Sequence, residues 1–81
     1  MTYIEALQKE KRWFKRVLII SIFHYKMKMR NKKWAMRNTA KRLQLSLGTI
    51  SEALLLARAL HKWPELELLS REQALSKARN E

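Results

Sequence analysis

The sequence predicts an all-α protein: a small helical domain with a long N-terminal helix and a central pair of helices. Only one Gly and one Pro occur in 81 residues, so few residues interrupt helices. Apolar residues recur at spacings of three and four along most of the chain. Two helix-start patterns, at Thr2–Glu5 and Ser70–Gln73, pair a hydroxyl residue with Glu or Gln three positions later. We expect a single domain over residues 1–81, because no stretch has the length of a linker.

The first predicted element is a helix from the capping pattern at Thr2 to about Met29. Its expected apolar face comprises Ile4, Leu7, Phe14, Leu18, Ile22 and Tyr25, with one basic interruption at Lys11. Such a helix would have roughly 27 residues and a length of roughly 40 Å at 1.5 Å per residue. The alternative at residues 17–20 is a strand, since β-branched residues are concentrated there. No second strand is visible to pair with it, which favours the helix.

The same segment predicts a homodimer. Between residues 17 and 25 the apolar side chains occupy more than one side of the helix, and such a helix must be covered on more than one side. The remaining chain is too short to provide that cover, so a second subunit is expected to supply it. The run is also far shorter than the roughly 20 residues that span a bilayer. The predicted interface residues are Phe14, Val17, Leu18, Ile20, Ile22 and Tyr25.

Residues 34–62 form the predicted helix pair. A break at residues 31–33 precedes Trp34, which is expected to anchor the core, and a helix over residues 36–44. Ser46 is the expected N-cap of a second helix that ends near Lys62, because the residue before Pro64 is pushed out of the helical region. The residues expected to face inward are Ala40, Leu43, Leu45, Ile50, Ala53 and Leu54. Two short helices joined by a tight turn form a helix-turn-helix, the unit that reads duplex DNA.

The C-terminal residues 64–81 predict two further helices. Pro64 is well placed as the first residue of a short helix that carries Leu66, because its fixed φ suits that position. The capping pattern at Ser70 begins the last helix, with Ala74, Leu75 and Ala78 expected to face inward.

The helix pair also carries a family resemblance. The matching elements are Trp34, Thr39-Ala40, Leu43, Leu45-Ser46, the run from Thr49 to Glu52, Leu54, Leu56-Ala57 and Pro64-Glu65-Leu66. On these residues the stretch 34–68 resembles the helix-turn-helix domains of phage repressors and, more closely, the ParB-like versions of plasmid and phage proteins. It departs from them at Gln44, where Gly is common, and at Ala35, which has no side-chain acceptor for a helix cap. The resemblance implies DNA binding by the second helix; it does not imply plasmid segregation, because no nucleotide-binding or partner-recruiting domain is visible.

Helix geometry assigns two sets of contacts to this motif. The first turns of the second helix would reach base edges, and the residues concerned are Ser46, Leu47, Gly48, Thr49, Ser51 and Glu52. Glu52 could accept from a cytosine amino group, or sharpen discrimination by repelling phosphates. The start of the first helix would meet the backbone, and the expected phosphate contacts are Lys32, Lys33, Arg37, Asn38, Thr39 and Lys41.

The distribution of charge supports a polyanionic partner. The net charge is +11, and residues 9–42 hold thirteen Lys or Arg against one acid, whereas residues 43–81 hold five of each sign. If basic residues served only solubility, both signs would be interspersed throughout. The segregation therefore favours a polyanion as the partner. Together with the helix-turn-helix pattern it predicts a sequence-specific protein that binds double-stranded DNA and regulates transcription or replication.

The composition argues against catalysis. The chain has no Cys and no Asp, and its single Gly cannot build a phosphate-cradling loop. We therefore expect no enzyme activity, cofactor, metal or small-molecule substrate. We also expect both His residues to lie in the core or at its edge. With no visible leader or membrane span, we expect no membrane association and a cytoplasmic protein, nucleoid-associated if bacterial or phage.

Two alternative functions remain open. One is an adaptor or membrane-surface protein that docks through its basic N-terminal helix, with the motif serving only as packing. The other is a single-stranded nucleic-acid binder, because aromatic residues lie among the basic ones. Their helical spacing favours core packing instead. The aromatics concerned are Trp13, Phe14, Phe23, Tyr25 and Trp34.

Overall fold

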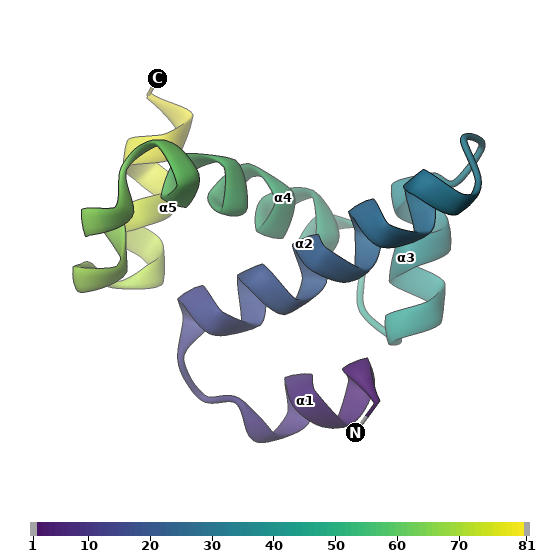
Figure 1. The fold of residues 1–81 in the computed structure, drawn as a ribbon. Coiled ribbons are helices and arrows are strands. Elements are labelled where there is room, and N and C mark those ends of the chain that lie inside the picture. Colours follow the sequence, from purple (N-terminus) through teal and green to yellow (C-terminus); the bar gives the residue numbers. More distant parts are fainter. Residues whose placement is uncertain (1, 81) are drawn as a thin grey trace.

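Two crossed helices, α2 and α4, form the centre of the fold. The structure is a computed structural model that describes residues 2–80. In chain order its helices are α1 (Tyr3–Lys9), α2 (Trp13–Arg30), α3 (Met36–Leu43), α4 (Leu47–Lys62), the 3-10 helix η1 (Pro64–Leu68) and α5 (Arg71–Arg79). Figure 1 shows α2 crossing α4, with α3 near one end of α4 and α5 near the other. Residues 2–80 contain no strand, which confirms the all-α class; the outermost positions of the predicted domain, Met1 and Glu81, lie outside the described residues.

The predicted N-terminal helix of roughly 27 residues is wrong, because the chain breaks at residues 10–12. Glu10 leaves the helix with an extended backbone, and Arg12 Nε donates to its carboxylate at 2.9 Å. This hydrogen bond lowers the pKa of Glu10 to about 2. The Arg16 guanidinium donates to the carbonyls of Leu7 and Glu10, which satisfies the open end of α1.

The break allows α1 to fold back along α2, as Figure 1 shows. Leu7 thereby becomes buried, and the rings of Tyr3 and Phe23 meet edge-on with their centroids 4.9 Å apart. A continuous helix would leave Leu7 in water. Burial of the apolar face of α1 therefore accounts for the turn. Residues 17–20, for which a strand was the alternative, lie within α2.

The turn between α3 and α4 begins one residue earlier than predicted, because α3 ends at Leu43 and Gln44 belongs to the turn. Gln44 adopts the left-handed conformation (φ 59°, ψ 43°), at a cost of roughly 1 kcal/mol for a residue with a side chain. Leu45 N donates to Ala40 O at 2.9 Å, which satisfies a carbonyl at the end of α3. Ser46 then caps α4, its Oγ accepting from Thr49 N at 3.1 Å.

The core lies on the inner sides of α2 and α4 and is closed by the other helices. Ile50 and Leu56 of α4 are fully buried, and Leu66 brings η1 onto the same core. Trp13 Nε1 donates to Leu69 O at 3.0 Å and ties the start of α2 to the segment after η1. The residues that were predicted to face inward and are buried are Ala40, Leu43, Ile50, Ala53, Leu54, Ala74, Leu75 and Ala78.

Two of the predicted dimer residues are core residues of this chain. Val17 and Ile20 are only 5% and 3% exposed, so they cannot form a subunit interface. The fold itself supplies the cover that the sequence assigned to a second subunit, because α1 folds back on α2 and α4 crosses it. Of the other predicted residues, Phe14 is half-buried, whereas Leu18, Ile22 and Tyr25 are exposed.

Candidate nucleic-acid interface

A buried hydrogen-bond network fixes α3 against α2. Thr39 Oγ1 accepts from Trp34 Nε1 at 2.7 Å and shares a second hydrogen bond, also 2.7 Å, with His24 Nδ1. Because an indole can only donate, the Thr39 hydroxyl keeps its own hydrogen available for His24. Burial, followed by the charge of Lys28, lowers the pKa of His24 and favours the neutral imidazole. His24 is thus a satisfied core residue, as predicted.

Thr39 therefore cannot contact phosphate, contrary to the prediction. Its side chain is 0% exposed, because it lies between His24 and Trp34. Thr39 is only two residues from the exposed Arg37 on α3, but its side chain points into the core. Its hydroxyl instead sets which face of α3 is turned outward.

The outward face of α3 and the preceding loop are strongly cationic. Asn38 is also exposed, and its Oδ1 accepts from Ala35 N at 3.1 Å; the N–H groups of the first turn of α3 have no side-chain cap from Ala35. Residues 31–43 contain no acid. The exposed cations of this cationic face are Lys32, Lys33, Arg37, Lys41 and Arg42, of which only Arg42 was not among the predicted contacts.

One side of α4 remains open to solvent. At its N-terminal end this side presents Leu47, Gly48 and Ser51, all exposed. Ser46 and Thr49 are engaged with each other, since their hydroxyl oxygens lie 2.7 Å apart in the cap. We call Leu47, Gly48 and Ser51 the reading edge of α4. It follows the turn directly, so it lies beside the end of α3.

Glu52 is directed toward α5 rather than outward. Its carboxylate lies 2.6 Å from Arg71 Nη2 and 3.0 Å from Arg79 Nη2, which joins both ends of α5 to α4. The hydrogen bond from Arg71, reinforced by the charges of both arginines, lowers the pKa of Glu52. Helical periodicity gave no signal for this pairing, because the three residues are 19 and 27 positions apart.

The Glu52 pairing makes a testable contribution to stability. A carboxylate whose pKa is lowered by folding stabilises the protein above its ordinary pKa of 4.5, and this contribution is lost as pH falls through the lowered value. Glu52→Gln should therefore lower the Tm at about pH 7, and the difference from the wild type should shrink below about pH 5. Thermal unfolding across this range, with Glu72→Gln on α5 as the matched control, measures it. A difference independent of pH would contradict the assignment.

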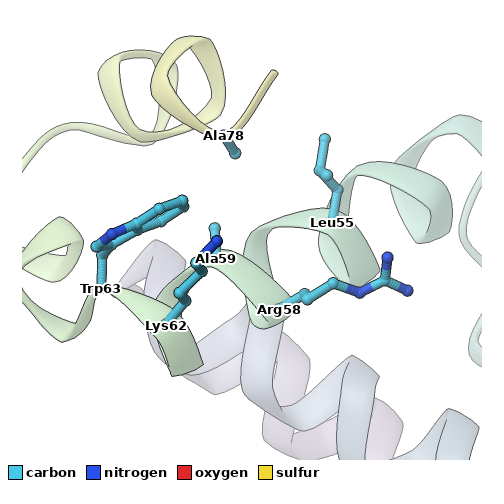
Figure 2. A pocket seen from close by; sticks show the side chains of 6 residues that line it. All are labelled: Leu55, Arg58, Ala59, Lys62, Trp63 and Ala78. Atoms are coloured by element: carbon cyan, nitrogen blue, oxygen red, sulfur yellow. The ribbon is translucent and has the colours of Figure 1, made fainter. Parts of the chain in front are cut away.

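The C-terminal half of α4 borders an open hollow of about 250 Å³ between α4 and α5. Figure 2 shows Trp63 reaching toward Ala78, with the side chains of Arg58 and Lys62 on α4 nearby. Lys62 Nζ lies 4.6 Å from the centre of the Trp63 ring, a cation–π contact. Arg58 and Lys62 thus continue the open side of α4 with positive charge.

Residues 2–80 contain no group of three or more His, Cys, Asp or Glu placed to hold a metal ion. No single helix there is long and apolar enough to cross a membrane; only the bent pair α3 and α4, taken together, meets those limits.

Comparison of the chain with protein-family models, curated proteins and solved structures gave no match.

Proposed function

We propose that this protein binds double-stranded DNA sequence-specifically, as a regulator of transcription or replication of the plasmid or phage type, with α3 and α4 acting as a helix-turn-helix. Three residues, 44–46, join the two helices, and the chain bends by 110° between them. Both values suit such a motif, which joins its helices by a short turn at roughly 90–120°. The second helix would enter the major groove, which is wide enough for an α-helix.

The observation that carries the proposal is the juxtaposition of the reading edge and the cationic face. Small or apolar groups at the start of α4 can approach base edges, while the five cations of residues 31–43 can neutralise nearby phosphates. The buried contact of Thr39 with His24 fixes the inner side of α3, which leaves Arg37, Lys41 and Arg42 of this helix exposed. Affinity and base reading would thus come from adjacent parts of one rigid unit.

Within this unit the three reading-edge residues have different roles. Ser51 can donate to or accept from a base edge, and Leu47 can contact a thymine methyl group. Gly48 allows the backbone to come close to the groove. Glu52, held by Arg71 and Arg79, instead supports the position of α4.

Gly48→Ala separates folding from DNA contact. A Cβ built at Gly48 meets nothing within 4 Å, and Ala favours a helix by about 0.5–1 kcal/mol. The variant should therefore be as stable as the wild type or more stable, yet bind its duplex more weakly, because the added methyl group occupies space needed by the DNA. Thermal unfolding and fluorescence anisotropy with a labelled duplex measure both effects. Unchanged duplex affinity would show that α4 does not approach DNA at this point.

Selection of binding sites from random duplexes tests the proposed function itself. The wild type should enrich a defined sequence, and Ser51→Ala should relax the preference at one position while keeping affinity for random DNA. Lack of enrichment would refute sequence-specific reading. Tighter binding to single strands than to duplexes would favour the alternative single-strand mode instead.

A further inference from the structure

An exposed apolar stripe runs along α2. Leu18, Ile22, Tyr25 and Met29 follow one another at spacings of four, three and four, so they lie on one side of the helix. Ile22 is 59% and Met29 88% exposed, although both are large apolar side chains. These four account for most of the exposed large apolar side chains of residues 2–80, and such a contiguous patch marks an interaction surface.

The stripe continues into a groove between α2 and α4. Two hollows of about 350 and 180 Å³ share Leu18, Ala57 and His61 in their walls, so they form one depression beside the stripe. Its walls come from both helices, with Tyr25 on α2 and Leu54 on α4. We call the stripe and these hollows together the α2–α4 groove. Its length from Leu18 to Met29 is about 16 Å, three turns of a helix.

The shape of the surface favours a protruding helix as the occupant. An amphipathic helix lays apolar side chains into such a groove at positions three and four apart. A lipid surface is flat on this scale and would reach Ile22 and Met29 but not the walls at Ala57. The recessed walls of the α2–α4 groove thus favour a protein partner over a membrane.

The charge of the surface selects among protein partners. Lys15, Lys26 and Lys28 are exposed within one turn of the stripe, and Arg58 stands at the α4 side. Residues 13–30 hold five cations and no acid. Symmetric pairing of α2 with α2 of a second copy would double this positive charge, and among the residues that line the two hollows only Glu67, at the η1 end, could offset it, so such pairing costs free energy. A partner with acidic flanks would be attracted.

We propose that the α2–α4 groove binds an amphipathic helix of another protein, with apolar residues along one side and Asp or Glu along its flanks. This assigns the exposed residues Leu18, Ile22 and Tyr25 to a different partner from the predicted second subunit. The proposal does not depend on DNA binding, because the reading edge and the cationic face contribute none of the residues that line the groove.

A synthetic helical peptide of about five turns, with Leu along one side and Glu on both flanks, serves as the probe. Titration into isotopically labelled protein should give saturable NMR shifts confined to α2 and α4 around the groove. A peptide of the same pattern with Lys in place of Glu should not bind. Ile22→Ser should weaken binding about tenfold, the effect of losing one well-packed apolar contact.

Leu68→Ser is the matched control, because Leu68 is 83% exposed on η1, away from the stripe. This variant should bind the peptide like the wild type, and both variants should keep their helical circular dichroism and their duplex affinity. The proposal is overturned if no saturable shifts appear, or if both Ser variants behave alike. It is also overturned if sedimentation shows a dimer that Ile22→Ser abolishes, or if phosphatidylserine vesicles bind the protein through Ile22 while the peptide does not.

Discussion

Replacing both Arg37 and Lys41 by Glu should reduce duplex affinity by about 100-fold or more at moderate salt, because two phosphate contacts become repulsions. Both side chains are exposed on α3, four positions apart on one side of the helix. The slope of log K against log salt should also flatten by about 2, since each lost contact releases roughly one counterion fewer. Anisotropy titrations at several KCl concentrations measure both quantities.

The matched control is the double variant Lys9→Glu and Lys77→Glu. It changes the net charge by the same amount, at exposed positions on α1 and α5 rather than on α3. We expect it to weaken binding only modestly, through the long-range field that salt screens. An equal loss in the two double variants would mean that overall charge, and not the cationic face of α3, holds the DNA.

Leu56→Ala should destabilise the protein by about 3 kcal/mol, the usual effect of truncating a fully buried Leu. Leu56 is 0% exposed in the middle of α4, which packs against α2, α3, η1 and α5. A cavity there would therefore loosen contacts on several sides at once. For a domain of this size the Tm should fall by more than about 10 °C, a large part of a total stability of about 5–15 kcal/mol.

Leu68→Ala gives the comparison, because the same atoms are removed from a side chain that is 83% exposed. Its effect should stay within about 0.5 kcal/mol. Thermal unfolding of the two variants and the wild type, followed by circular dichroism, measures these differences in Tm. Similar Tm values for both would contradict the placement of Leu56 in the core.

The central position of α4 links these predictions. One side of the helix buries Ile50, Leu54 and Ala57, and a neighbouring side carries Ser51 and Arg58 into solvent. A change on the buried side should thus alter stability, whereas a change on the open side should alter binding. Variants such as Gly48→Ala test this division directly, because their expected effects on stability and on affinity have opposite signs.

Several features of the fold could be predicted because they depend on neighbouring residues. The Ser46 cap, the Ser70 capping box and the start of η1 at Pro64 all occur where the sequence placed them. Gln44, which departs from the family pattern, nevertheless takes the left-handed conformation that Gly commonly adopts at such a turn. In each case the hydrogen bond or dihedral restriction lies within a few positions of the residue.

The errors in the N-terminal half have a different origin. Apolar residues keep helical spacing on both sides of residues 10–12, with only Lys11 interrupting the face, so periodicity alone did not show that the chain turns there and buries Leu7. Val17 and Ile20 were assigned to a partner subunit because the helices that cover them could not be recognised from the sequence. One of these helices, α1, packs on α2 only because the chain turns at residues 10–12, and the other, α4, is distant in sequence.

The sequence by itself determined the all-α class, the positions of α3, α4 and α5 and the concentration of positive charge before residue 43, because local hydrogen bonding and composition govern these properties. Only the tertiary structure decided which side of each element faces solvent. It buried Thr39 against His24, turned Glu52 toward Arg71 and Arg79, and left an apolar stripe open on α2. These outcomes depend on contacts between residues far apart in the chain, for which helical periodicity carries no information.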